Sequence, residues 1–311
     1  MKLRVIFLKK KYLFFLMPLI LFLIILVLII YRNYTTSSTF TTISKDTILK
    51  SDLNGDGIKD SLYVKQANNK YLIKVKIKDK IFDINTDDKS SILSNYYTYW
   101  PLRVTLMDIS RDRIPEIFLQ GSLGKNSVQR IFVFDGNNFK NIISNSNNIL
   151  GFIDCTNNRT PKVITGRFQG DIMLLTNYIF SNSKFKNYNL EDNPGFLGKD
   201  TVCSFINFIQ TLPSSRPYEP NNIFSSNISN DDMYVLDKLA KSDTSYTFQD
   251  AIFKERKSDK NGNSAEVQWT LNFKGVSNSD TSIIKNYSIN IILDADKNSS
   301  SSNYFKIVSI Y

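Results

Sequence analysis

A short acidic segment carries oxygen-bearing side chains at alternate positions. Residues 52–60 read Asp-Leu-Asn-Gly-Asp-Gly-Ile-Lys-Asp. Alternate residues of a tight loop converge on one point, and carboxylate, amide and carbonyl oxygens are the ligands that calcium prefers. Gly55 and Gly57 can adopt the left-handed backbone conformation that such a loop requires. We therefore expect a calcium site, with Ile58 contributing its backbone carbonyl, formed by Asp52, Asn54, Asp56, Ile58 and Asp60.

The residues after this loop distinguish it from an EF-hand. An EF-hand has a bidentate acid at its twelfth position and continues into a helix, but here that position is Tyr63 and Ser-Leu-Tyr-Val is typical of a strand. The pattern D-x-N-G-D-G-x-x-D followed by a strand resembles the calcium loops of FG-GAP and VCBS repeats, found in integrin α-subunit propellers and in bacterial surface proteins. This resemblance implies blade-like hairpins and a structural calcium ion. The residues alone also allow an acidic turn without metal.

The same spacing occurs twice more, with changes. Residues 108–116 keep oxygen at positions one, three, five and nine, and residues 154–162 keep it at positions one, three and five. The second copy replaces both loop glycines by Arg111 and Arg113, and an arginine in the left-handed conformation costs about 1–2 kcal/mol. The second copy is therefore the weaker calcium candidate, with the ligands Asp108, Ser110, Asp112, Ile114 and Glu116.

Basic side chains of the later copies are expected to replace the ion. We expect the guanidinium groups of Arg111 and Arg113 to neutralise the acids of their own loop, and Arg159 and Lys162 to complete the same replacement in the third copy. Calcium would then bind mainly to the first loop, where it neutralises crowded carboxylates and fixes the loop.

The regular spacing extends beyond the loops. A turn follows 27 residues after the first aspartate of each copy, and residues 131–141 align without gaps with residues 177–187 at a period of 46. Both segments are typical of hairpins, so we expect three loop-strand-hairpin repeats within residues 46–194. A propeller needs about four to eight blades. We therefore expect the rest of the chain to cap the array, the alternative being that a partner chain supplies more blades.

An aromatic cluster accounts for the greater length of the first repeat. The first repeat is 56 residues long and the second 46, and the extra residues lie near 94–101. Exposed aromatic faces there could stack on the sugars of a cell wall or anchor a protein partner. The alternative, which we favour, is that these side chains pack under the hairpin or on the next domain. The residues concerned are Tyr96, Tyr97, Tyr99 and Trp100.

The composition excludes several kinds of catalytic and metal site. The chain has no histidine, so it has neither a Ser-His-Asp nor a Cys-His nucleophile and no histidine-ligated zinc or iron. Its two cysteines, Cys155 and Cys203, are too few for a tetrahedral thiolate site, and their spacing leaves open whether they pair. We predict no catalytic residue.

The amino-terminal segment has the composition of a membrane anchor. Residues 12–30 contain no charge, and 19 residues of helix span about 29 Å at about 1.5 Å per residue, close to a bilayer core. The basic tail at 1–11 predicts a cytoplasmic amino terminus, with a Thr/Ser-rich tether at 31–45 leading to extracytoplasmic domains. After residue 34 only 33 basic side chains face 29 acidic ones, so we expect no nucleic-acid partner.

Residues 195–311 show a different pattern. Apolar residues recur at helical spacing in 201–212, where Asp200 is the expected cap, and in 231–241, where Ser229 is the expected cap. Helices followed by a long antiparallel sheet indicate an α+β domain. The order of elements and the closing strand YFKIVSIY resemble the ketosteroid-isomerase-like cone fold, which can enclose a pocket. The expected strands are 246–253, 266–273, 287–293 and 304–311.

Together these features predict an amino-terminal transmembrane helix, a mainly β repeat domain with three copies of propeller-blade-like hairpins, and an α+β carboxyl-terminal domain. The function we infer is a single-pass, membrane-anchored, extracytoplasmic binding or assembly protein of the cell envelope, with one calcium-stabilised repeat loop. Its partner would be a protein or a cell-wall glycan. The alternatives are a glycan-binding adhesin that uses the aromatic cluster, and an enzyme that uses carboxylates of the carboxyl-terminal domain.

Overall fold

The computed structural model describes most of the chain after its amino-terminal segment. The predicted tail at 1–11, all but two residues of the predicted membrane segment at 12–30, and most of the tether at 31–45 lie outside the described residues. The described residues are Met17, Phe22 and 40–311, apart from gaps at 44–45, 86–91, 156, 182–183, 189–195, 214–221 and 297–303.

No helix in this described part of the chain is long and apolar enough to cross a membrane. The two α-helices found there contain 12 residues each, so each spans about 18 Å of the roughly 30 Å of a bilayer core. The described residues therefore give no support to the predicted single-pass anchor, or to the extracytoplasmic localisation that we inferred from it.

Strands dominate the described residues. The helical elements are η1 (Phe196–Gly198), α2 (Lys199–Gln210) and α3 (Asn230–Lys241). The strands are β1 (Thr41–Ile43), β2 (Thr47–Ser51), β3 (Asp60–Ala67), β4 (Lys70–Ile77), β5 (Lys80–Ile84), β6 (Leu102–Met107), β7 (Glu116–Leu123), β8 (Asn126–Phe134), β9 (Phe139–Asn145), β10 (Ile149–Ile153), β11 (Lys162–Gln169), β12 (Ile172–Ser181), β13 (Lys184–Asn187), β14 (Thr244–Ser258), β15 (Ser264–Ser277), β16 (Ile284–Ala295) and β17 (Phe305–Ile310).

Three antiparallel meanders of four strands follow one another along the chain: β2 to β5, β6 to β9 and β10 to β13. In each meander the acidic loop joins the first strand to the second, and a two-residue turn joins the second strand to the third, at 68–69, 124–125 and 170–171. The second strand always begins at the ninth position of the loop, which is Asp60, Glu116 or Lys162.

A fourth meander, which was not expected from the sequence to resemble the other three, contains β14 to β17. Strand β10 pairs in parallel with β14, so the third and fourth meanders form one sheet of eight strands. This sheet contains strands from both sides of residue 195, where we expected a separate α+β domain to begin. The predicted fold class is therefore wrong, because the carboxyl-terminal strands extend the third sheet and the described chain is mainly β.

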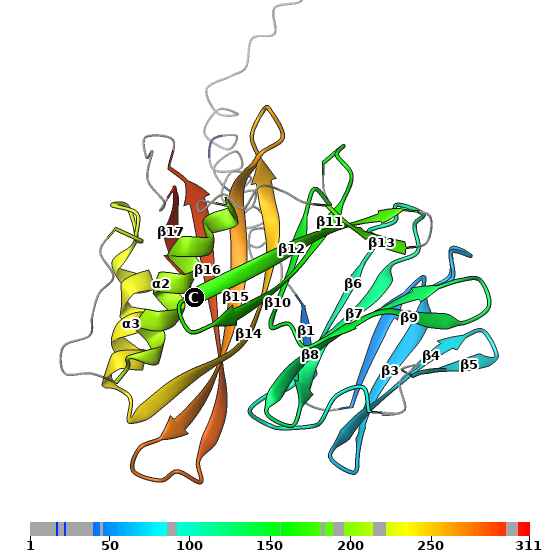
Figure 1. Ribbon diagram of the computed structural model, residues 1–311, viewed down its shortest axis with the longest axis horizontal. Coiled ribbons are helices and arrows are strands. Elements are labelled where there is room, and N and C mark those ends of the chain that lie inside the picture. Colours follow the sequence, from blue (N-terminus) through cyan, green and yellow to red (C-terminus); the bar gives the residue numbers. More distant parts are fainter. Residues whose placement is uncertain are drawn as a thin grey trace, which may run out of the picture. The chain divides into compact units, whose positions relative to one another are not determined.

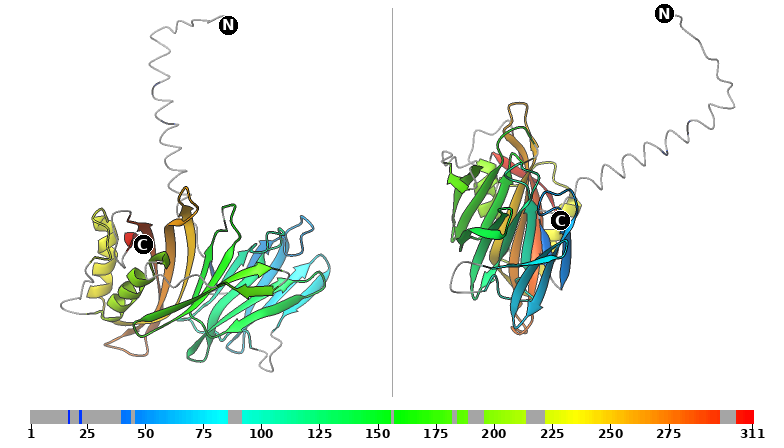
Figure 2. Two further views of the ribbon diagram at one scale, coloured as in Figure 1. Left: turned by 45° about the horizontal axis from the view of Figure 1, so that its top comes forward. Right: turned by 90° about the vertical axis from the view of Figure 1, so that its right-hand side faces the viewer.

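Apolar faces pack these sheets against one another. One core cluster joins the first and second sheets around Val75 and Phe132, and another joins the second and third around Phe118 and Phe152. Helices α2 and α3 pack on a third cluster, around Trp269, that lies on the other face of the eight-stranded sheet. Within residues 39–311, the helices lie at one end and β3 to β5 at the other (Figures 1 and 2).

The helices follow their apolar spacing. Ser229 is the N-cap of α3 and accepts the N–H of Asp232 at 3.1 Å, as predicted. Helix α2 begins differently, because its N-cap is Gly198 in the left-handed conformation and Asp200 lies in the first turn. The carboxylate of Asp200 is still favourable there, at the positive end of the helix dipole. The buried stripe of α2 contains the predicted Val202, Phe205, Ile206 and Ile209.

A buried ion pair fixes the second sheet to the fourth meander. Asp250 of β14 and Arg103 of β6 are both fully buried, and Nη1 of Arg103 lies 2.7 Å from Oδ2 of Asp250. The same carboxylate accepts hydrogen bonds from Nε1 of Trp100 at 2.5 Å and Nδ2 of Asn272 at 2.8 Å. Burial raises the pKa of Asp250 and lowers the pKa of Arg103, while each charge opposes the shift of the other.

We predict that Asp250→Asn lowers the free energy of unfolding by about 3–5 kcal/mol, because it leaves a buried guanidinium group without a counter-charge. Urea unfolding at neutral pH, followed by circular dichroism, measures the loss. The control is Asp83→Asn, since the Asp83 side chain is 56% exposed and pairs with Lys74 at the surface. This change should cost under about 1 kcal/mol. Equal effects of the two substitutions would contradict the role given to Asp250.

Candidate functional site

Asp52 closes the first acidic loop. Its two carboxylate oxygens accept the backbone N–H groups of Gly55 and Gly57, at 2.7 and 2.8 Å. Both glycines have left-handed φ values, 79° and 82°, as predicted. A Cβ atom at Gly55 would lie 2.9 Å from Cγ1 of Ile114, so glycine also allows the second loop to approach closely.

The other two acids of this loop are also engaged. Asp60 accepts the N–H of Leu53 at 2.9 Å, and burial raises its pKa. Oδ2 of Asp56 lies 2.9 Å from Nζ of Lys78, which follows β4 and lowers the pKa of Asp56 to about 2. The ammonium group of Lys78 therefore brings a positive charge to the loop in which calcium was expected.

The predicted calcium ligands do not form an assembled metal site. In the part of the chain that the structure describes, no group of three or more acidic or cysteine side chains is placed to hold a metal ion. The first-loop carboxylates face backbone N–H groups and Lys78 instead. The structure therefore gives no support to calcium binding, which stays a prediction, at Asp52, Asn54, Asp56, Ile58 and Asp60 or at Asp108, Ser110, Asp112, Ile114 and Glu116.

The second loop keeps the backbone of the first in spite of its arginines. Asp108 accepts the N–H of Arg113 at 3.0 Å, and Glu116 accepts the N–H of Ile109 at 2.7 Å. Arg111 and Arg113 adopt the left-handed conformation, with φ of 61° and 72°, where the first loop has glycine. Each of these conformations costs about 1–2 kcal/mol, so contacts elsewhere must offset the strain.

Arg111 makes its contacts with the third loop. Its Nη2 donates to the backbone carbonyl oxygens of Asp154 at 3.2 Å, Asn157 at 2.5 Å and Arg159 at 2.6 Å. This corrects our expectation that the guanidinium group neutralises the acids of its own loop. Arg111 instead ties the second loop to the third.

The third loop contains the replacement that we expected from Lys162. The ammonium group of Lys162, at position nine of the loop, pairs with the carboxylate of Asp154, at position one. Arg159, which we expected to take part in the same replacement, instead reaches the next loop, where it donates to the carbonyl of Asn261 between β14 and β15. Gly262, which lies beside Arg159, has a left-handed φ of 76°, a conformation that favours glycine. Each of the three acidic loops thus contacts the loop that follows it.

The predicted aromatic cluster does not form one exposed platform. Tyr96 packs edge-on against Tyr71, with ring centroids 5.6 Å apart, and so belongs to the core between the first two sheets. Tyr97 and Tyr99 stack on each other at 5.2 Å, and Nζ of Lys274 lies 5.1 Å from the centre of the Tyr99 ring. The fourth member, Trp100, lines a pocket.

A bulge in β14 directs Gln249 out of the regular strand pairing. Phe248 pairs with Phe273 and Asp250 pairs with Asn272, so Gln249 is the extra residue. Its side chain is buried, with 4% of its surface exposed. Neither the amide nitrogen nor the amide oxygen has a hydrogen-bond partner among the residues that the structure describes. An unpaired buried polar group of this kind costs about 1–3 kcal/mol.

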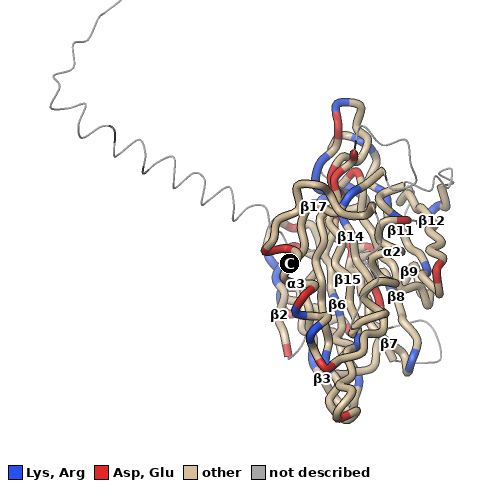
Figure 3. Tube along the Cα trace, turned by 90° about the vertical axis from the view of Figure 1, so that its left-hand side faces the viewer, with Lys and Arg blue, Asp and Glu red and all other residues tan. Residues whose placement is uncertain are grey.

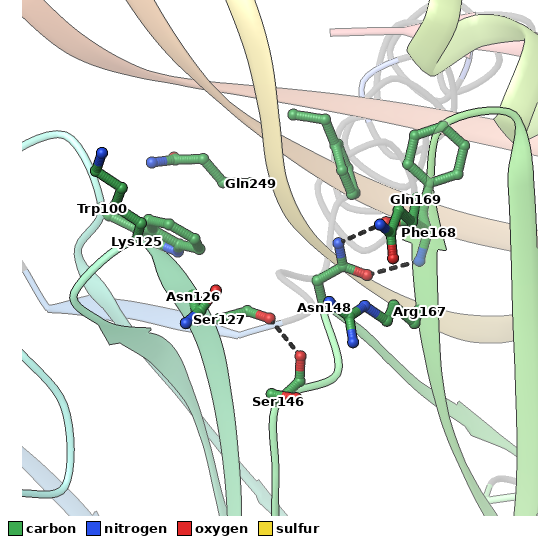
Figure 4. A pocket seen from close by; sticks show the side chains of 11 residues that line it. Trp100, Lys125, Asn126, Ser127, Ser146, Asn148, Arg167, Phe168, Gln169 and Gln249 are labelled. Atoms are coloured by element: carbon green, nitrogen blue, oxygen red, sulfur yellow. Dashed lines mark hydrogen bonds between the residues drawn. The ribbon is translucent and has the colours of Figure 1, made fainter.

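Gln249 belongs to the lining of a pocket of about 320 Å³. Figure 4 shows Trp100, Lys125 and Asn126 on one side of the pocket and Arg167 and Gln169 on the other. The lining comes from the second sheet, the third sheet and β14, and consists of Trp100, Lys125, Asn126, Ser127, Ser146, Asn148, Arg167, Phe168, Gln169, Phe248 and Gln249.

Some polar groups of the lining hold the walls in place. Asn148 donates to the carbonyl of Phe168 at 3.0 Å and accepts its N–H at 2.8 Å. Ser127 donates to the carbonyl of Ser146 at 2.8 Å. The indole N–H of Trp100 is bound to Asp250. These groups position the wall, because their hydrogen bonds are already made within the protein.

The charged groups of the pocket are all basic. Lys125 and Arg167 lie on opposite sides and are exposed, and no acidic side chain is part of the described lining.

The two cysteines are free thiols outside this lining, and burial raises the pKa of each to about 12. Neither is therefore a thiolate at neutral pH.

Of the pocket residues, only Trp100 was among the site residues predicted from the sequence. Lys125 lies in the two-residue turn at 124–125, and Arg167 and Gln169 lie just before the equivalent turn at 170–171. The register of the repeats could have placed these turns at the same end of their sheets, opposite the acidic loops. Gln249 could not be found in this way, because its position depends on a bulge.

We predict that Lys78→Ala raises the pKa of Asp56 from about 2 towards the ordinary 3.8, because Lys78 is the largest cause of the shift. The pKa is lowered in the folded state, so this interaction stabilises the fold above about pH 4 and is lost as the pH falls through about 2. Titration of the Asp56 carboxyl signal by NMR measures the shift. Lys76→Ala, which removes a nearby lysine from β4, should leave the pKa unchanged; the same shift in both variants would contradict the pairing.

Comparison with known proteins assigns no family to this chain. No family model matches it, and no curated protein matches it. The resemblances to FG-GAP and VCBS repeats and to the cone fold are therefore not supported by any match.

Proposed function

We propose that the protein is a non-catalytic binding protein, and that its pocket holds a small hydroxyl-rich anion such as a sugar acid. The observation that carries this proposal is the buried amide of Gln249, which has no partner among the described residues. A ligand hydroxyl group can accept from this amide nitrogen and donate to its oxygen, which removes the cost of leaving both atoms unpaired.

The charge of the pocket supports an anionic ligand. Lys125 and Arg167 approach from opposite sides, and arginine can bind a carboxylate through two parallel hydrogen bonds. Asn126 and Gln169 add amide groups that can bind hydroxyls of either polarity. A carboxylate joined to several hydroxyl groups satisfies this set better than an apolar molecule does.

The size and the aromatic residues favour a single sugar ring. A pocket of about 320 Å³ is at the small end of the range of about 300–1,000 Å³ found for ligand sites. Trp100 contributes an indole ring to one side, and Phe168 and Phe248 form an edge-to-face pair with centroids 5.3 Å apart. Aromatic surfaces of this kind can pack against the C–H groups of a sugar.

The same residues support binding over catalysis. The chain has no histidine, and the described lining has no carboxylate or thiol that could act as a general acid or base. The carboxylate enzyme that we considered for the carboxyl-terminal half therefore has no suitable group in this pocket.

We predict that Gln249→Met lowers the affinity for glucuronate about tenfold, a loss of about 1.4 kcal/mol. The same substitution should raise the free energy of unfolding of the ligand-free protein by about 1–2 kcal/mol, because methionine has similar size and leaves no polar atom unpaired. Isothermal titration calorimetry measures the affinity, and urea unfolding measures the stability.

Glucose and acetate are the control ligands, and each should bind at least tenfold more weakly than glucuronate. Lys241→Gln, at the exposed end of α3, is the control variant and should bind as the unmodified protein does. If glucuronate does not bind, or if it binds Gln249→Met as well as the unmodified protein, the proposed function is wrong.

A further inference from the structure

The first sheet has one buried face and one open face. On β4, Tyr71, Ile73 and Val75 point into the core, and the residues between them point outwards. The described residues end on this side with β2 to β5, and no other described strand or helix is paired or packed beyond them. Among the described residues, these outward side chains are therefore exposed to solvent.

This surface combines aliphatic side chains with lysines. Leu72 is 48% exposed and Ile81 is 62% exposed, which is high for side chains of their size. They contribute to a groove of about 440 Å³ that we call the basic face, formed by Tyr63, Lys65, Leu72, Lys74, Lys76 and Ile81. Exposed apolar groups gathered in a groove and bordered by polar groups are typical of interaction sites.

Strand pairing places charged and apolar groups side by side on the basic face. Lys65 is opposite Leu72 across β3 and β4, and Lys76 is opposite Ile81 across β4 and β5. Lys74 has Tyr63 on one side. Each lysine thus has an apolar neighbour at the distance of a cross-strand pair, about 4.5–5.5 Å between Cβ atoms.

The positive charge of the basic face is largely uncompensated. Asp83 lies opposite Lys74 and pairs with it at 3.0 Å. Within the described residues, neither Lys65 nor Lys76 forms an ion pair. In contrast to the basic face, several loops carry basic and acidic residues close to one another (Figure 3). The basic face therefore offers two lysines whose charge a partner can neutralise.

We infer that the basic face docks an acidic segment of a partner protein in which apolar residues are interspersed with Asp and Glu. The complementary charge meets Lys65 and Lys76, and the apolar residues cover Leu72 and Ile81. A second copy of this chain is a poor occupant, because two basic faces repel each other. A nucleic acid is also disfavoured, since Tyr63 is the one aromatic ring that lines the groove and aliphatic groups do not provide stacking surfaces.

The test uses a fluorescein-labelled peptide of twelve residues that contains Glu, Asp and Leu, with fluorescence anisotropy as the readout. The unmodified protein should bind it, and 0.5 M NaCl should weaken binding, because salt screens the exposed charges. The double variant Lys65→Glu/Lys76→Glu should bind at least tenfold more weakly. Leu72→Ser should weaken binding about threefold without changing the net charge.

Lys238→Glu/Lys241→Glu on α3 is the matched control, since it reverses the same number of lysines away from the first sheet. It should bind the peptide as the unmodified protein does. Equal losses in both double variants, or tighter binding of a thymidine oligonucleotide than of the peptide, would overturn the inference. Circular dichroism confirms folding, and glucuronate titration of the same variants reports separately on the pocket.

Discussion

The buried carboxylate of Asp250 is the constraint on which the arrangement of the sheets depends. Burying a carboxylate costs several kcal/mol, and the cost is offset because three donors converge on it, from Trp100, Arg103 and Asn272. Two of these donors belong to the chain around β6 and the third to β15, so they meet only when the second sheet and the eight-stranded sheet are in one relative position. Gln249 immediately precedes Asp250 in β14, so the interaction that fixes the sheets also fixes the wall of the pocket.

The acidic loops show how one backbone can be retained while the groups that balance its charge change. Lys78 pairs with an acid of the first loop, and Lys162 pairs with an acid of the third. The side chain of Arg111 extends away from its own loop and donates to three carbonyl groups of the next loop. Its left-handed conformation, which would otherwise favour glycine, is offset by these charge-assisted hydrogen bonds. The loops are therefore connected to one another by side chains of the protein.

The sequence predicted the parts of this fold that depend on local pattern. The turns at 78–79 and 135–138, the left-handed arginines, the Ser229 cap and the Lys162 pair all follow from residue type and spacing. The parts that depend on distant partners were missed or wrong. The parallel pairing of β10 with β14 joins segments about a hundred residues apart, and no periodicity within either segment indicates it. The target of Arg111 likewise lies in another repeat.

The pocket lies where the repeat pattern is interrupted, and this explains why repetition alone could not reveal it. Equivalent turns of the second and third sheets supply Lys125 and the segment before Gly170, but they enclose a site only where β14 completes the wall. Strand β14 belongs to the fourth meander, whose long strands and preceding helices conceal its relation to the other three. A bulge is tolerated in such a long strand because many other pairs hold its register. The unpaired amide of Gln249 is thus the consequence of a local irregularity that the surrounding sheet is strong enough to maintain.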